Sequence, residues 1–188
     1  MTYTLNQITD ALTAAAGRPD RGRVFQQLRN LHQRGSLKHF DTGGPKGAFR
    51  FAEFEIYVAR ILSAAVENGI AGDELGRLEA TLRHGRTAVF ADASMTISLD
   101  ANLARMTGDN PEQWLIEIAR ARDLETGQMH SSFAWARRES DGRINRFGSL
   151  YPDPLSPEVV MGDGGAVEGV TLLAITKMLA PLIKNIGH

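Results

Sequence analysis

The spacing of apolar residues changes near residue 85, and this change does most to limit the folds open to the chain. Before it, apolar residues recur at intervals of three and four, which is the period of an amphipathic helix. After it, they alternate or cluster in short β-branched and aromatic runs, which is typical of strands. The sequence therefore predicts an α+β protein. Its first domain, residues 1–85, is helical, and its second, residues 86–188, has an antiparallel sheet and a terminal helix.

Four helices are predicted in the first domain, and turn-forming residues separate them. The first two cover residues 3–17, with Thr4 as N-cap, and residues 21–34, with Asp20 as N-cap. The stretch GRPDRG joins them, so they form a helix-turn-helix candidate. The stretch SLKHFDTGGPKGAFRF follows and predicts a β-hairpin with a Gly-rich tip, which would be a wing. The other two helices are predicted at 53–68 and at 72 to about 83.

The predicted helix at 21–34 has a polar face of unusual composition. Between Arg21 and Phe40 there is no Asp or Glu, although the whole chain has a formal charge of -1. A helix that only needs solubility more often carries Glu and Lys, which support each other four residues apart. Arg, Gln and Asn can each pair with two atoms of a base edge, and a carboxylate beside phosphate would weaken binding. The composition therefore favours a helix that reads DNA.

The charge of the chain is also unevenly distributed. Residues 1–50 hold eight Lys and Arg against three Asp and Glu, whereas residues 51–188 hold thirteen against nineteen. A basic head on an acidic body indicates a polyanion-binding part joined to a part with another role. Chance clustering on a solvated surface explains the charge alone equally well.

Four short stretches carry a resemblance to a known family. YTLNQITDAL, LRNLHQRGSL, GAFRF and ARILSAAVENGIAGDEL occur in the order found in the winged helix-turn-helix head of MerR-like transcription regulators. The resemblance covers about residues 3–84. The chain departs from the family in a longer connection before Leu28, in Asn30–Leu31 where the family has an aromatic pair, and in the absence of a coiled coil after Leu82.

Together the helix composition and the resemblance imply a sequence-specific reader of double-stranded DNA. Bases would be read by Arg29, Gln26, Asn30 and Arg23, and phosphates would be held by Arg21, Lys38, Lys46 and Arg50. Three further candidates for the DNA-binding surface are Gln27, Gln33 and His39. The expected role is a transcription regulator that acts as a homodimer, with a possible small-molecule effector. An architectural or excision-type DNA-binding factor is an alternative, since MerR-like heads also occur in excision factors.

The second domain carries strand signals and no recognised motif, so its role is open between dimerisation and sensing. Strands are expected in TAVFADASMTISLD, and a meander of about three strands between Trp114 and Phe147, with SDGR as a turn. Residues 149–165 read as a Pro- and Gly-rich loop, followed by a helix over Val167–Asn185. That helix is apolar on most sides and therefore packs in the core or against a second subunit. Trp114, Phe133 and Trp135 belong first to a core, with a ligand cavity as the alternative.

The sequence contains no recognised catalytic or metal-binding pattern. The chain has no cysteine, its five histidines lack ligand spacing, and no GxSxG is present. His32 falls near the apolar face of its helix and reads as a packing residue. We therefore expect no enzyme, cofactor or metal, and keep a partner- or ligand-binding module without DNA activity as the competing class. A cytoplasmic protein without membrane contact is expected, because the start lacks a signal peptide and the most apolar segment carries charges.

Overall fold

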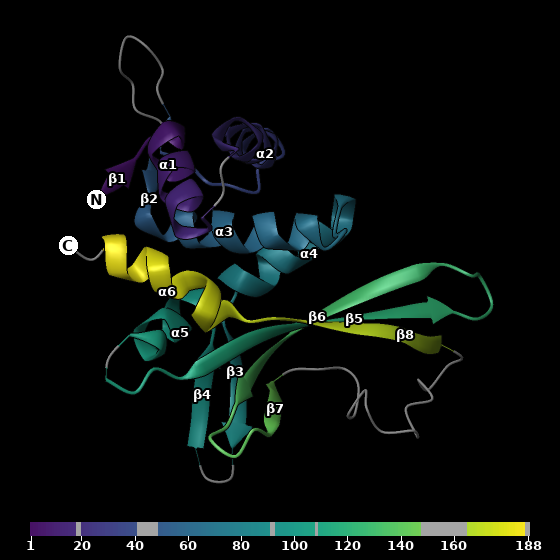
Figure 1. The fold of residues 1–188 in the computed structure, drawn as a ribbon. Helices are drawn as coiled ribbons and strands as arrows, with labels where there is room; N and C mark the ends of the chain where they lie inside the picture. The colour runs from purple at the N-terminus through teal and green to yellow at the C-terminus, as the bar shows by residue number, and fades with distance from the viewer. Residues whose placement is uncertain (18–19, 41–48, 91–92, 108, 148–164, 187–188) are drawn as a thin grey trace. The chain divides into compact units, whose positions relative to one another are not determined.

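The computed structural model describes residues 1–17, 20–40, 49–90, 93–107, 109–147 and 165–186. The chain divides into two compact units, Met1–Glu79 with Lys177–His188, and Ala80–Thr176. The predicted α+β class is confirmed, since helices dominate the N-terminal part, antiparallel strands dominate the C-terminal part, and the last element is a helix (Figure 1). The predicted division at residue 85 differs from these units in placing the whole terminal helix in the second part.

All four helices predicted in the first part are present. They are α1 (Leu5–Ala15), α2 (Arg21–Gln33), α3 (Glu53–Glu67) and α4 (Gly72–Arg83). Both predicted N-caps are correct: the Thr4 hydroxyl accepts from the Gln7 N–H in a capping box, and the Asp20 carboxylate accepts from the Arg23 N–H at 2.9 Å. Gly35, with a φ of 73°, ends α2 in the left-handed conformation that suits glycine. Sequence periodicity and caps therefore predict this region well.

A small antiparallel sheet lies beside these helices. It pairs β1 (Thr2–Tyr3), which the sequence did not predict, with β2 (Phe51–Ala52), which begins at the last residue of the predicted wing hairpin. Phe40 forms an isolated antiparallel bridge with Arg50, just before β2. Within the predicted hairpin at residues 36–51, the residues before Phe40 form no strand, because Leu37 is buried and the Lys38 N–H donates to the Glu55 side chain of α3. The predicted hairpin tip, residues 41–48, lies outside the described residues.

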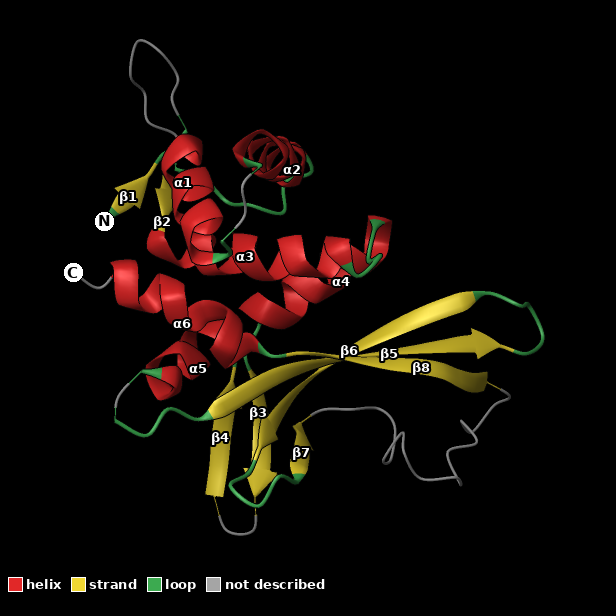
Figure 2. Ribbon diagram, in the orientation of Figure 1, coloured by secondary structure: helices red, strands yellow, loops and turns green. Residues whose placement is uncertain are grey.

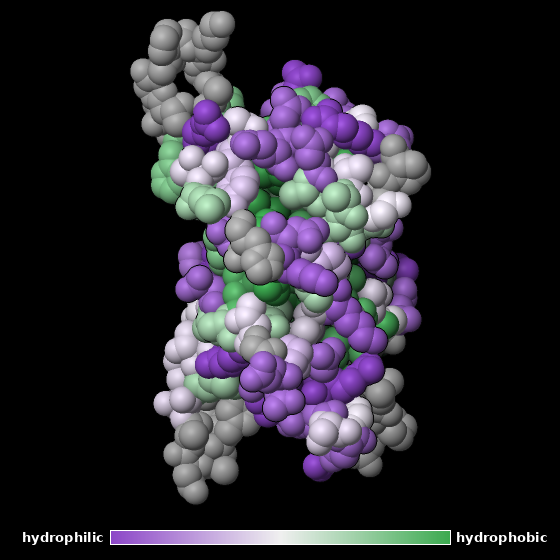
Figure 3. Space-filling model, turned by 60° about the vertical axis from the view of Figure 1, so that its left-hand side comes forward, coloured by the Kyte–Doolittle hydropathy of each residue, from purple (hydrophilic) through white to green (hydrophobic). Residues whose placement is uncertain are grey.

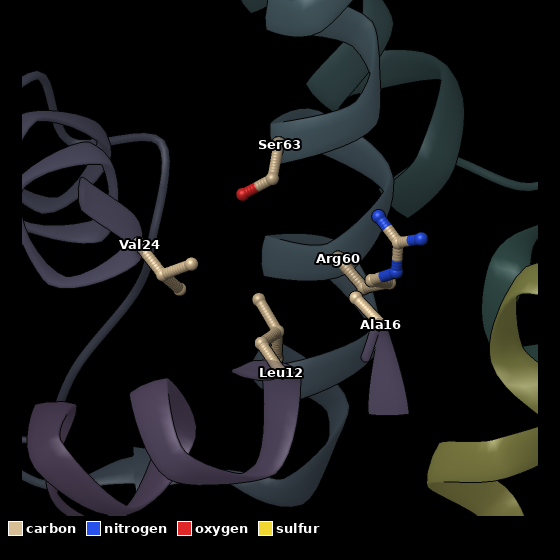
Figure 4. Close-up of a pocket in the computed structure, with 5 residues that line it drawn as sticks. All are labelled: Leu12, Ala16, Val24, Arg60 and Ser63. Atoms are coloured by element: carbon tan, nitrogen blue, oxygen red, sulfur yellow. The ribbon is translucent and has the colours of Figure 1, made fainter. Parts of the chain in front are cut away.

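The first three helices share one apolar core. Figure 2 shows α1, α2 and α3 as neighbouring helices, and Leu12 of α1 and Val24 and Leu28 of α2 are buried. At the point where α1, α2 and α3 meet, a cavity of about 10 Å³ remains, which is the space of one water molecule (Figure 4). The Ser63 hydroxyl points into it and has no hydrogen-bond partner among the described residues. The helices are therefore closely packed around a small, partly polar cavity.

In the second unit, a hairpin and a helix follow the end of α4. The hairpin pairs β3 (Arg86–Phe90) with β4 (Ala93–Ile97), which agrees with the strand composition of this region. The helix α5 (Leu99–Met106) follows, and the Ser98 hydroxyl caps it by accepting from the Ala101 N–H. This helix was not predicted, since its eight residues are too few to show a clear period.

The main sheet of the second unit contains the predicted meander. Its strands are β5 (Gln113–Asp123), β6 (Met129–Arg138), β7 (Ile144–Phe147) and β8 (Gly165–Leu173), in the order β7-β6-β5-β8. The meander of β5, β6 and β7 is confirmed. The predicted helix over Val167–Asn185 is wrong in its first half, because that half is β8, and α6 covers Ile175–Ile186. A short apolar run fits a strand or a helix equally well, and here pairing with β5 decides it.

Aromatic residues fill one face of this sheet. Trp114 is fully buried and meets Trp135 edge to face, with ring centroids 6.0 Å apart. The Trp135 indole N–H donates to the Thr81 carbonyl at 3.2 Å, and the Trp114 backbone N–H donates to the Thr176 hydroxyl at 2.8 Å. Both tryptophans and Phe133 are buried, as the core interpretation of the sequence predicts.

The described helices are all too short or too polar to cross a bilayer.

Candidate nucleic-acid interface

The face of α2 that points away from the core carries the predicted cations and amides. Val24, Leu28 and Leu31 are buried on one side of the helix. The exposed residues of the other side share long side chains with hydrogen-bonding ends and no negative charge; they are Arg23, Gln26, Arg29, Asn30 and Gln33. We call these five residues the α2 polar face. At the height of α1 and α2, the space-filling view is mostly hydrophilic (Figure 3).

Hydrogen-bonding groups on the α2 polar face are mostly open to a ligand. The Gln26 amide donates to the Asn30 side-chain oxygen at 3.0 Å, one helical turn away. This bond orders the two amides side by side and leaves each with further donor or acceptor capacity. The Arg29 guanidinium is exposed and makes no hydrogen bond or ion pair with the described residues. A planar ligand with several hydrogen-bond acceptors could therefore accept from the Arg29 guanidinium and the two amides.

Three residues predicted to bind DNA are engaged within the protein. Arg21 pairs with Asp10 at 2.6 Å, and this hydrogen bond raises the pKa of Arg21. The Gln27 amide donates to the Ser63 carbonyl of α3 at 3.1 Å, so it ties two helices together. Lys38 donates to the Gly35 carbonyl at 2.8 Å and lies 3.6 Å from the Glu79 carboxylate. These side chains hold the head together before any ligand binds.

The base of the predicted wing adjoins the end of α2. We define the wing base as Phe40 together with Phe49, Arg50 and Phe51. Phe51 is fully buried, whereas Phe40 and Phe49 are 56% and 48% exposed, which is unusual for side chains of this size. Arg50 is half-buried, and its carbonyl accepts from the Phe40 N–H at 2.7 Å. Lys46, also predicted to bind phosphate, lies outside the described residues.

His32 and His39 meet at this junction. Nε2 of His32 lies 3.1 Å from Nδ1 of His39, so His39, a candidate for the DNA-binding surface, turns this nitrogen toward α2. Burial and the neighbouring imidazole of His39 lower the pKa of His32. His32 therefore has the packing role that its sequence position predicts.

Glu55 holds the segment between α2 and the wing base, and sequence reasoning missed it. This carboxylate is 4% exposed and accepts from the Lys38 backbone N–H at 2.9 Å. It replaces the strand hydrogen bond that the predicted hairpin would have made. An acidic residue in the first turn of a helix is ordinary, so no sequence signal marks this role.

An open hollow lies beside the α2 polar face. Its volume is about 370 Å³, and Arg23, Gln26, Gln27, Val66 and Glu67 line it. Glu67 is the only acidic residue among those that line the hollow. The hollow is therefore a border of the interface, with a charge that a phosphate would avoid.

The described residues contain no group of three or more side chains that could hold a metal ion. Comparisons of the chain with protein-family models, with curated proteins and with solved structures found no match.

Proposed function

We propose that the chain is a sequence-specific double-stranded DNA-binding protein that acts as a dimer in transcription regulation. One observation carries the proposal: α2 buries one side in the helical core and exposes a side with Arg, Gln and Asn but no acid. The order of α1, α2, wing base, α3 and α4 is that of the MerR-like heads which the sequence resembles.

The dimensions and chemistry of the major groove support this assignment. The groove of B-DNA is about 12 Å wide and admits one α-helix. Within it, guanidinium and amide groups can pair bidentately with guanine or adenine, and each good pair contributes about 1–3 kcal/mol of discrimination. Arg29 and the Gln26–Asn30 pair are the proposed base-reading groups. Arg50 and the exposed end of α2 would meet the phosphates beside the groove.

A second subunit is part of the proposal because one head offers few cations. The exposed arginines on or beside the α2 polar face are Arg23, Arg29 and Arg34. Each neutralised phosphate contributes about 0.9 to the slope of log affinity against log salt. A single head would therefore bind weakly at physiological salt, and two heads related by a two-fold axis would read two half-sites. The second unit would supply dimerisation or effector binding.

The test is fluorescence anisotropy of the full chain with random duplexes across a salt series, followed by selection of the bound pool. Steep salt dependence with an enriched sequence supports the proposal. Arg29→Ala should then lower the preference for the selected site over random duplex by about 1–3 kcal/mol.

Arg143→Ala is the matched control, since Arg143 is 81% exposed in the second unit, outside the proposed interface. It should leave affinity and preference unchanged. If neither the wild type nor the variants bind duplex at low salt, DNA binding by the free chain is refuted. The α2 polar face would then be assigned to docking with a protein partner.

A further inference from the structure

The pair formed by His32 and His39 joins α2 to the connection that leads to the wing base. His32 lies in the last turn of α2, and His39 lies in the connection that leads to the wing base. Their rings meet edge to face, with centroids 4.9 Å apart and the facing nitrogens 3.1 Å apart. The pair is therefore a specific link between the proposed recognition helix and the wing.

Two phenylalanines of the wing base enclose the pair. Phe49 stands edge-on to both rings, at 4.6 Å from His32 and 4.4 Å from His39. Phe51 packs against His32 at 5.2 Å and is fully buried. Phe49 is held by the two imidazoles on its inner side while about half of its surface is exposed. Any separation of the imidazoles therefore moves Phe49 and the adjacent Arg50.

The link depends on how many protons the two rings hold. With neutral rings, or with one extra proton, one facing nitrogen donates and the other accepts. With two extra protons both facing nitrogens carry hydrogen, and no acceptor remains between two positive charges. The low pKa of His32 follows from burial first and from His39 second. The C-terminal end of α2 favours a cation at His32 and so opposes these two effects.

The described charged groups near the pair are cations and carboxylates that are engaged elsewhere. Arg34, Lys38 and Arg50 are neighbours in sequence of the helix end, of His39 and of Phe49. The carboxylates on the adjoining turn of α3 have other partners: Glu55 accepts from the Lys38 N–H, and Glu53 accepts from the Tyr57 hydroxyl at 3.0 Å. Of the charged groups that the structure describes in the head, His39 is the one that lowers the pKa of His32.

We propose that His32 and His39 are positioning residues that hold the wing base against α2, and that DNA binding weakens when the pair takes up its second proton. This inference rests on the proposed function. The expected change of DNA affinity with pH is opposite to the change that charge attraction alone would cause. A histidine that gains charge beside phosphate strengthens binding as the pH falls, whereas opening of this pair misplaces Phe49 and Arg50 and weakens it.

The first experiment measures duplex affinity at constant ionic strength at about pH 7.5 and about pH 5.5, which bracket the ordinary histidine pKa. The wild type should lose affinity several-fold at the lower pH. His39→Asn keeps a hydrogen-bonding atom near the position of Nδ1 but does not titrate, so its affinity should change much less. His130→Asn, at an exposed histidine of β6, should behave as the wild type. Unchanged or rising wild-type affinity, or an equal fall in His39→Asn, overturns the inference.

The second experiment needs no DNA. In the free full-length chain, the NMR amide signals of Phe49 and Arg50 should shift along the titration curve of the His32 ring, and these shifts should vanish in His39→Asn. If the amides do not follow His32, the positioning role is refuted even where duplex binds. If they follow it and no duplex binds, the link between α2 and the wing base stands, and the proposed function with its DNA consequence fails.

Discussion

The second unit contains two ion pairs of nearly equal length, and their difference in burial predicts a large difference in their effect on stability. Arg146 lies 2.5 Å from Glu117, with side chains 16% and 2% exposed. Arg143 lies 2.6 Å from Asp141, with side chains 81% and 49% exposed. We expect Arg146→Met to destabilise the second unit strongly and Arg143→Met to have no measurable effect.

The magnitude follows from what each substitution leaves behind. Glu117 is on the central strand β5, where its cross-strand neighbours Ala134 and Leu172 offer no side-chain hydrogen bond. Removing Arg146 therefore leaves a buried carboxylate without its cation, at a cost of about 3–5 kcal/mol. Replacing both residues by methionine removes the desolvated charges together and should be close to neutral. The double variant therefore regains most of the stability lost by Arg146→Met.

Urea unfolding followed by tryptophan fluorescence measures this directly. The chain has two tryptophans, Trp114 and Trp135, and both belong to the second unit. With a denaturant dependence of about 1–3 kcal/mol/M, the expected loss lowers the midpoint by at least about 1 M. The control Arg143→Met should keep the wild-type midpoint.

Two results would contradict this reasoning. A loss below about 1 kcal/mol in Arg146→Met, the size typical of an exposed pair, would mean that water reaches the Glu117 carboxylate. A double variant as unstable as Arg146→Met would mean that packing around the arginine stem, and not the unpaired charge, sets the cost.

Three further predictions concern the head. Asp20→Ala removes the N-cap of α2 and should lower the free energy of unfolding by about 1 kcal/mol, whereas Asp20→Asn should keep most of it. Ser63→Ala removes a buried hydroxyl without a described partner, so thermal unfolding should show equal or slightly higher stability; a loss above about 1 kcal/mol would indicate a bound water. His32 has a lower pKa folded than unfolded, so the unfolded chain binds more protons below about pH 6.5. The free energy of unfolding should therefore fall as the pH drops below that value, and this slope should shrink in His32→Gln.

The helices of the head could be predicted because their information is local. Thr4 and Asp20 mark helix starts, and the apolar residues of α2 repeat with the helical period, so the α2 polar face follows from its spacing. Local sequence patterns gave the wrong element where pairing with a distant segment determines the secondary structure. Residues from Val167 to Leu173 form a strand because β5 pairs with them, and no feature within the segment excludes a helix.

The candidate site was only partly visible for the same reason. Exposure of Arg29 and Asn30 follows from helical geometry. The engagement of Gln27 with Ser63 depends on how α2 crosses α3, which spacing within α2 does not fix. The contact between His32 and His39 depends on Glu55 holding the intervening segment, which a sequence pattern does not encode.

The terminal helix α6 belongs largely to the first unit, although it follows the second unit in the sequence. The first unit consists of Met1–Glu79 and Lys177–His188. The second unit is therefore inserted into the first along the chain and is joined to it at both ends. Truncation after Arg83, where the helical pattern stops, would therefore remove the C-terminal segment of the first unit. α6 contributes Leu179 and Leu182, both fully buried in the intact chain. A smaller protein that keeps the proposed DNA-binding face is better made by excising the second unit and bridging the gap to α6 than by cutting the chain short.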